Sequence, residues 1–523
     1  MSARLNTAMS LPRIEELPDD PAVLRGVVGQ LLKLLTAANG KVETLQAQVE
    51  QLVRRLYGRS SEKWDPDQSV MDALLATVVE QGPVPAAPAA ASVKIAAHAR
   101  KVPPHGRSIF PETLKHEEVI IPVPEAERRC PITGQARPLI GYEETKKLDY
   151  RPSELVVKVY KREKLGSVAN AEETGVVTAP AVDSVVPKSL MDHGLLAQVV
   201  VSKFVDHLPL YRQENIFARQ GVSLSRRTMS DTLVAAAEPL SRLSDLVGKK
   251  VLESGLVHHD DTPVDLLTEG TSHTRGIKEA RLWVATVPVR DGPWTHFTFT
   301  TSRESRHIEE FFKGYRGSVM SDDFIGYGPL EGADIVRLLC WAHTRRKFFE
   351  AQNSNPAESA EMLERIGGLY RLERSVESGP EHDDTRLRMR REQALPQLEA
   401  ILERLKAWSG PTPPKTPLGK AVSYAIDNWP FLIRYVEDPR RPLDNNPAEQ
   451  TIRPVALGRK NWLFMGSERG GRAAAVYMTL VATCKRAQVN PFDYLRDVFA
   501  RLMAHSTHKL DDLLPGNWKP LTN

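Results

Sequence analysis

Apolar residues recur every seven positions across residues 21–57. Two such series run three or four residues apart, which is the a/d seam of a coiled coil, and Val or Leu at a with Leu at d favours a parallel dimer. The two series are Val28, Leu35, Val42, Val49 and Leu56, and Leu24, Leu31, Ala38, Leu45 and Leu52. The pattern predicts a dimerising coiled-coil segment over residues 1–64. One long amphipathic helix packed on its own chain is the alternative.

This helical pattern gives way to a linker and then to a β-rich module. Residues 65–110 contain GPVPAAPAAAS and KVPPHGR, whose Pro, Ala and basic residues without periodicity are typical of a flexible linker. Short apolar runs such as EEVIIPV and ELVVKVYKRE, separated by Pro and Gly, follow this linker. They predict a small β module over residues 111–190.

Residues 191–250 show helical patterns on both sides of a turn. PLYRQENIFARQ is followed by Gly221, a natural helix stop, and by Ser225, a natural N-cap. Two short helices around a tight turn make a helix-turn-helix candidate, in which Arg226 and Arg227 lead the second helix and could contact DNA phosphates or base edges. An ordinary helical hairpin fits the same spacing.

Strand patterns dominate from residue 251. LVHHDDTPVDLL, ARLWVATVPV and THFTFTTSR are followed by the helical SRHIEEFFKGY, the strand-like SVMSDDF and DIVRLLCW, and the helical AHTRRKFFEA. This order matches a ribonuclease H-like core, in which a mixed sheet is flanked by helices. We predict an α/β multidomain protein with the first part of this core at 251–354, a charge-rich helical insertion at 355–430, and the second part with C-terminal helices at 431–523.

Composition limits the class of protein more than it indicates a function. The 523-residue chain has 41% hydrophobic residues, enough for sizeable cores, and its net charge of +4 only weakly favours a polyanionic partner. Three cysteines without paired spacing argue against a disulfide framework. Because neither a signal peptide nor an apolar run of about 20 residues is visible, we expect a cytoplasmic protein without membrane spans.

Acidic residues follow two of the predicted strands. The motif HHDD at 258–261 ends the first strand, and Asp322 and Asp323 end the fourth. Side chains alternate between the two faces of a strand, so only one aspartate of each pair can belong to a given site. The pattern does not choose between Asp260 and Asp261, or within the second pair. Isolated carboxylates at strand ends can hold the hard divalent ions that phosphodiester cleavage needs.

A third acidic residue, Glu449, stands near a predicted helix start. Asn446 is a good N-cap, Pro447 is a good first helical residue, and Glu449 lies three residues beyond the cap. This spacing fits a metal ligand and equally a helix capping box, in which the glutamate would only satisfy backbone N–H groups.

Several stretches of the chain resemble the transposases of the insertion sequence 66 family. They are VVSKFVDHLPLYRQENIFARQGVSLSRRTMSD, VHHDDTPV, SDDFIGY, CWAHTRRKFFE, LDNNPAEQTIRPVALGRKNWLFMGSERGG and DDLLPGNW, with LYGRSSEKW at the end of the family's leucine-zipper region. The resemblance covers most of residues 20–520. It implies a DDE-type triad on a ribonuclease H-like fold, with Asp260 before an acid-Thr-Pro-Val string, Asp322 five residues before a tyrosine, and Glu449 three residues after Asn-Asn. The neighbours Asp261 and Asp323 are expected to tolerate substitution better.

The resemblance also implies an activity. Such an enzyme cleaves DNA at the terminal inverted repeats of its element and transfers the freed 3′-OH to target DNA, with two Mg²⁺ or Mn²⁺ ions held by the triad and no organic cofactor. It would self-associate, work with accessory proteins of the element, and act in the bacterial cytoplasm, associated with the nucleoid when bound to DNA. A metal-dependent nuclease of the same fold and a catalytically inactive DNA-binding protein are the alternatives.

One departure from the family concerns zinc. The family has a small zinc module with two Cys-x-x-Cys-like pairs after the linker. Here Cys130 stands alone, Thr133 replaces the second thiol, and residues 164–178 contain no Cys or His. Because structural zinc takes four nitrogen or sulfur ligands, we expect no structural zinc in this module.

Basic residues near the predicted site indicate DNA contacts. His343 begins a basic helix and could support the active site, with burial beside Trp341 as the alternative. The cluster after Glu449 mixes cations with Trp462, which suits backbone phosphates and a stacked base, although a solvated basic face around a buried Trp fits as well. The predicted DNA-contact residues are Arg226, Arg227, Arg345, Arg346, Lys347, Arg453, Arg459, Lys460, Trp462, Arg469 and Arg472.

Overall fold

The computed structural model describes residues 114–151, 154–166, 175–268, 276–332 and 334–520. These residues belong to one compact unit, His105–Asn523. The predicted coiled coil (1–64) and linker (65–110) lie outside the described residues, so both stay predictions. None of the helices described is long and apolar enough to cross a membrane.

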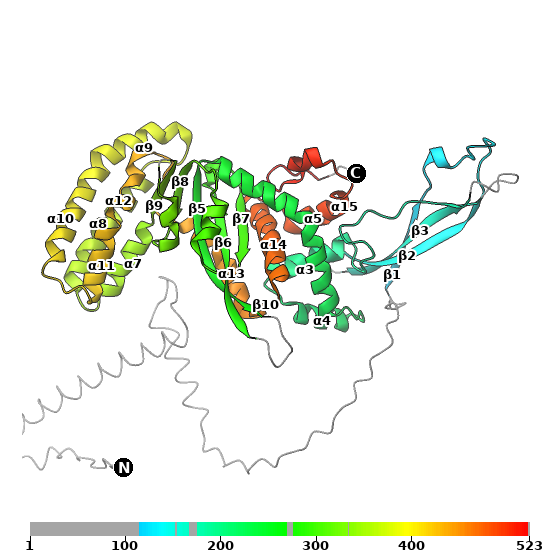
Figure 1. Cartoon of the computed structure of the whole chain (residues 1–523), viewed down its shortest axis with the longest axis horizontal. Helices are drawn as coiled ribbons and strands as arrows, with labels where there is room; N and C mark the ends of the chain where they lie inside the picture. Colours follow the sequence, from blue (N-terminus) through cyan, green and yellow to red (C-terminus); the bar gives the residue numbers. More distant parts are fainter. Residues whose placement is uncertain (1–113, 152–153, 167–174, 269–275, 333, 521–523) are drawn as a thin grey trace, which may run out of the picture. The chain divides into compact units, whose positions relative to one another are not determined.

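A six-stranded mixed sheet carries the aspartates singled out above (Figure 1). Its order is β7-β6-β5-β8-β9, with β10 added beside β5. The pairs β5–β6 and β6–β7 are antiparallel, whereas β5–β8, β8–β9 and β5–β10 are parallel. The strands are β5 (Leu256–Leu267), β6 (Ile277–Thr286), β7 (Thr295–Thr300), β8 (Gly317–Ser321), β9 (Ile335–Leu339) and β10 (Phe464–Met465). The strands β5 to β9 follow one another along the chain in the predicted order, whereas β10 was not predicted.

Helices cover both faces of this sheet because its apolar residues alternate. Val264, Leu282 and Val284 pack against α13 (Asn446–Trp462) and α14 (Glu468–Arg486) on one face. Val257, Trp283 and Val319 pack on the other face against α6 (Ser305–Phe311) and the 3-10 turn Ile325–Leu330. Burial on both faces is what makes β5 a run of mostly buried residues.

A helical layer packs against β9 and its following helix (Figure 1). Its buried leucine, isoleucine and tryptophan side chains form one apolar cluster with Leu339 and Trp341. The Trp341 indole N–H donates to the Leu432 carbonyl (2.9 Å), which ties this layer to the sheet. The helices are α7 (Trp341–Ala351), α8 (Pro356–Arg374), α9 (Asp383–Met389), α10 (Leu395–Ser409), α11 (Pro417–Asp427) and α12 (Trp429–Leu432), with a π-helical turn at Arg390–Ala394.

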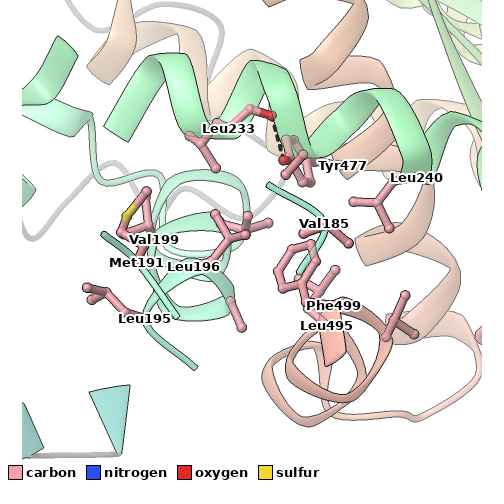
Figure 2. Packing of buried hydrophobic residues seen from close by; sticks show 14 of the residues in the cluster. Val185, Met191, Leu195, Leu196, Val199, Leu233, Leu240, Tyr477, Leu495 and Phe499 are labelled. Atoms are coloured by element: carbon pink, nitrogen blue, oxygen red, sulfur yellow. Dashed lines mark hydrogen bonds between the residues drawn. The ribbon is translucent and has the colours of Figure 1, made fainter. Parts of the chain in front are cut away.

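The predicted helix-turn-helix region has the expected turn but not the expected second helix. Gly221 has a φ of +78°, which favours glycine, and the Ser225 hydroxyl accepts the Thr228 N–H (3.1 Å) as an N-cap. The prediction of two short helices was wrong, because α5 continues for 28 residues. It does so because Leu233 and Leu240 are buried, and Tyr477 of α14 donates to the Leu233 carbonyl (Figure 2). The helices here are α3 (His193–Phe204), α4 (Leu210–Arg219), α5 (Arg226–Glu253) and the C-terminal α15 (Pro491–Arg501).

The β module forms its own sheet but shares its apolar core with these helices. Its strands are β1 (Lys115–Ile121), β2 (Leu139–Arg151), β3 (Glu154–Leu165) and β4 (Val177–Thr178), in the order β1-β3-β2 with β4 beside β3. Leu148 and Val157 belong to the same cluster as α3, α5, α14 and α15. Cys130 is buried in a turn before β2, closed by the Gly134 N–H donating to its carbonyl (2.9 Å).

Candidate active site

Asp260 lies in the middle of β5, on the same face as His258; the prediction that HHDD ends this strand was wrong, because β5 continues to Leu267. Burial is the main reason that its pKa rises, to about 7, and the negative charges of Asp322, Asp261 and Glu449 add to the rise, against a hydrogen bond from the Asp261 N–H (2.8 Å). Asp322 and Glu449 lie near enough for their charges to act on the Asp260 carboxyl group. The fold therefore brings together Asp260, Asp322 and Glu449, which are far apart in the sequence.

Asp322 reaches the site because β5 and β8 are parallel neighbours. Leu256 pairs with Ser318, and His258 pairs with Met320. Two further residues along each strand bring Asp260 level with Asp322, directly after the end of β8. The Asp322 Oδ1 atom accepts the Phe324 N–H (3.1 Å), which holds one of its two carboxylate oxygens.

The choice within the second aspartate pair follows from exposure. Asp322 is partly buried and is among the charges that raise the pKa of Asp260. Asp323 is exposed to solvent. The structure therefore puts Asp322 rather than its neighbour beside the first aspartate.

Glu449 lies in the first turn of α13, but it does not act as a helix cap. The N-cap residue is Asn445, one position earlier than expected. The Asn445 N–H donates to the Cys340 thiol sulfur (3.2 Å), and the Asn446 N–H donates to Asp444 (3.1 Å). Since these N–H groups already have acceptors, the capping box weighed for Glu449 is wrong.

The Glu449 carboxylate instead points to basic groups of α7. Its Oε1 atom lies 3.5 Å from His343 Nε2, and its Oε2 atom lies 4.0 Å from an Arg346 nitrogen. Oε1 is buried, and it makes no hydrogen bond with any residue that the structure describes. A buried carboxylate oxygen without a donor is unusual, because desolvation is offset only by a partner. This oxygen is thus available to a cation.

Asn445 was not singled out in the sequence, yet it joins α13 to β5. Its side chain is fully buried, its amide donates to the His259 carbonyl (3.0 Å), and its Oδ1 atom lies 3.1 Å from His258 Nδ1. Burial lowers the pKa of His258 to about 4, so this histidine is neutral at pH 7 and Nδ1 can donate to the asparagine. This contact places the first turn of α13 beside Asp260.

His343 is partly buried and lies at the predicted site. Together with Cys340 and Glu449 it offers three ligand atoms within 4.8 Å of one another, the one such group found among the described residues. Burial raises the pKa of the Cys340 thiol to about 12, so without a metal the sulfur is protonated at pH 7. The acids Asp260 and Asp322 are not part of that compact group.

The first set of predicted DNA-contact residues lies on α5 and α7. Arg226 and Arg227 are exposed at the start of α5, and the Arg227 side chain is 91% exposed. Arg345 lies on α7, as do Arg346, which is exposed near Glu449, and Lys347, whose ammonium lies 4.2 Å from the centre of the Tyr424 ring.

The second set, after Glu449, divides into exposed and packed residues. Arg459 donates to Thr262 Oγ1 (3.1 Å) and to the Pro263 carbonyl (2.6 Å), so its guanidinium holds α13 against β5. Trp462 is partly buried and lines a small cleft, with Lys203 over its ring. Burial lowers the pKa of Lys203 to about 8. The members of the set that are exposed are Arg453, Lys460, Arg469 and Arg472.

Comparisons with known proteins place the chain in a family. Residues 188–473 match the Transposase IS66 family, residues 479–515 match the IS66 C-terminal element, and residues 44–119 match the description "Transposase C of IS166 homeodomain". The chain is 30% identical to the uncharacterized protein y4jD of Sinorhizobium fredii, over 98% of each chain. It is 29% identical to the uncharacterized protein y4hP of the same organism, over 91% of this chain and 89% of y4hP. The chain therefore belongs to the Transposase IS66 family.

Proposed function

We propose that this transposase uses Asp260, Asp322 and Glu449 as a DDE triad to cleave DNA strands at the ends of its element and to join the freed 3′-OH to target DNA. The observation that carries the proposal is the convergence of three acids from β5, the end of β8 and the first turn of α13; burial raises the pKa of Asp260 to about 7, and the charges of Asp322 and Glu449 add to the rise. The strand order β7-β6-β5-β8-β9, antiparallel in its first three strands and parallel in the rest, supports a ribonuclease H-like core.

The donor set at this site fits hard divalent cations such as Mg²⁺ or Mn²⁺. The fit rests on oxygen ligands, on the crowding of carboxylates around Asp260, and on the buried Glu449 oxygen without a hydrogen-bond donor in the described part of the chain. Asp260 would be shared by two ions, with Asp322 completing one site and Glu449 the other. Two bound ions would supply activation of the attacking oxygen and stabilisation of the leaving oxygen.

The remaining residues of the site position the acids and attract DNA. Asn445 holds the start of α13 on β5, so Glu449 is presented next to Asp260. Arg346, whose side chain is 54% exposed, places a positive charge at the rim of the site, where a DNA phosphate would approach. The exposed Arg226, Arg227, Arg453, Lys460, Arg469 and Arg472 would contact the DNA backbone further away.

A strand-transfer assay tests this proposal. Labelled duplexes ending in the element's inverted repeat are incubated with the full chain, its accessory proteins, Mg²⁺ and a target plasmid. Asp260→Asn, Asp322→Asn and Glu449→Gln should lose both nicked and joined products, whereas the matched control Asp323→Asn, at the exposed neighbour, should keep both. Cleavage without joining by the wild type would favour a nuclease, and DNA binding without cleavage would favour an inactive binding protein.

We also propose that residues 21–57 dimerise the chain. Two lysines in the a/d seam would bury charge at the predicted interface, so Leu31→Lys with Leu45→Lys should produce monomers. Light scattering on the full chain measures this. A wild-type chain that is monomeric at high concentration would contradict the proposal.

A further inference from the structure

Asp261, the neighbour of the first residue of the proposed triad, forms ion pairs with two arginines. Its side chain is 1% exposed, and it lies on the face of β5 opposite Asp260. Arg281 of β6 donates to its Oδ2 atom (3.0 Å). Arg303, from the loop between β7 and α6, donates to its Oδ1 atom through Nε (3.0 Å) and through Nη2 (2.8 Å). Two guanidinium groups thus partly compensate one buried carboxylate, although burial still raises its pKa.

Arg303 also contacts Asp322, the second residue of the proposed triad. The same Nη2 atom that contacts Asp261 lies 3.3 Å from Asp322 Oδ2. The guanidinium also lies over the ring of Phe324, 3.8 Å from its centre. Phe324 donates its own N–H to the other oxygen of Asp322, Oδ1. Both oxygens of Asp322 are therefore held, one by the Phe324 backbone and one by an arginine that stacks on the Phe324 side chain.

We propose that Arg303 is a positioning residue for the metal site, and that it holds the Asp322 carboxylate in the orientation that binds a divalent cation, with Asp261 as its anchor. Asp322 needs such a partner because it lies in the turn after β8, where no strand pairing fixes it. A metal ligand has to be placed to within about 0.5 Å, which is the task of the residues behind it. The inference rests on the triad proposed above and extends it to the residues that orient it.

A purely electrostatic role predicts the opposite effect on metal binding. If Arg303 served only as a positive charge beside the acids, its removal would strengthen the binding of a cation, because a like charge would be gone. In a positioning role the forked guanidinium matters as well as the charge. Arg303→Lys keeps the charge but loses the fork that reaches Asp261 and Asp322 together, and Arg303→Gln loses both.

Mn²⁺ binding to the full chain without DNA separates these roles, measured by electron paramagnetic resonance or calorimetry. We expect both Arg303→Lys and Arg303→Gln to weaken Mn²⁺ binding by about 10-fold or more, in the range seen when residues behind a metal ligand are lost. Asp261→Asn should weaken it similarly. The double variant Asp261→Asn with Arg303→Lys should be no weaker than either single variant, because the two residues act in series.

The controls keep the inference separate from the proposed function. Arg316→Lys changes an exposed arginine, paired with Asp334 at 3.5 Å, and should leave binding unchanged. Asp322→Ala should abolish one Mn²⁺ site; if it binds Mn²⁺ like the wild type, the proposed triad itself is wrong. If Asp322→Ala loses binding while Arg303→Lys and Arg303→Gln bind Mn²⁺ as tightly as the wild type or more tightly, the positioning role alone is overturned. Arg303→Lys keeps the test valid if Asp261→Asn does not fold.

Discussion

Two adjacent aspartates lie within β5 and two more follow the end of β8, yet the two pairs lie in different environments. At β5 both acids are enclosed, because helices and loops cover both faces of this strand: Asp260 lies near α13, and Asp261 is paired with two arginines. At β8 only Asp322 turns inward, while Asp323 is exposed, because the chain leaves the sheet at that point. The same two-residue motif is therefore enclosed at both positions in one place and at a single position in the other.

The largest expected difference is in strand cleavage. Asp260→Ala and Asp322→Ala should each lower the cleavage rate by about 1000-fold or more, since catalytic groups that act as a unit fail together. Asp323→Ala should stay within about 2-fold of the wild type, as expected for an exposed residue away from the site. Gel-based cleavage assays at saturating Mg²⁺ measure this. Loss of activity in Asp323→Ala would show that both positions of the second pair are used.

The buried histidines around β5 predict acid sensitivity of the metal-free protein. Burial lowers the pKa of His258 to about 4, of His259 to about 3 and of His296 to about 4, so these groups stabilise the fold above pH 6.5 and lose that contribution as the pH falls. Each of these histidines should lower the free energy of unfolding by about 2 kcal/mol between pH 7 and pH 5. Asp260 acts in the opposite direction and should return about 2 kcal/mol, because its raised pKa favours the protonated form on folding.

These four groups together should therefore lower the free energy of unfolding by about 4 kcal/mol between pH 7 and pH 5. Urea unfolding in EDTA at the two pH values measures it. Asp260→Asn lacks the opposing contribution and should lose about 2 kcal/mol more over the same interval. Equal stability at both pH values would mean that the histidines are not buried as neutral groups.

Substitution of Asp261 should lower the free energy of unfolding much more than substitution of Asp323. Asp261→Asn leaves Arg281 and Arg303 without their shared carboxylate and should cost about 3 kcal/mol of unfolding free energy, as when one partner of a buried ion pair is removed. Asp323→Asn should cost less than about 0.5 kcal/mol. Both values come from denaturant melts. The ion pairs of Asp261 therefore predict a loss of stability at this position, while the expectation that both neighbours tolerate substitution in strand cleavage better than the triad stays a prediction.

A smaller effect is expected at a third pair of identical neighbours, Asn445 and Asn446. Asn445→Ala removes the contacts of α13 with His258 and His259, and should cost about 2 kcal/mol and lower the cleavage rate, because Glu449 is no longer held beside Asp260. Asn446 is exposed and contacts only the nearby Asp444 among the bonds described, so Asn446→Ala should cost under about 1 kcal/mol. Equal losses for the two variants would contradict this difference.

The sequence by itself determined the features that depend on neighbours within a few residues. The order of strands and helices around Asp260 follows from apolar periodicity, and the turn at Gly221 with its Ser225 cap follows from residues that favour those backbone conformations. Helices across residues 355–430 are also visible in the local pattern. The three acids themselves were candidates from their places after strands and near a helix start.

Tertiary structure decided what each of these residues does, because the deciding contacts join distant segments. His259 and Asn445 are 186 residues apart, and Asp261 and Arg303 are 42 residues apart. No local sequence pattern therefore predicts either contact. The same applies to Glu449. Local spacing allowed it as a helix cap, but in the fold the backbone N–H groups of Asn445 and Asn446 donate to the Cys340 sulfur and to the Asp444 carboxylate instead. Periodicity fixes which face of an element is buried, whereas the partner that meets a polar group on that face depends on which segments the fold brings beside it.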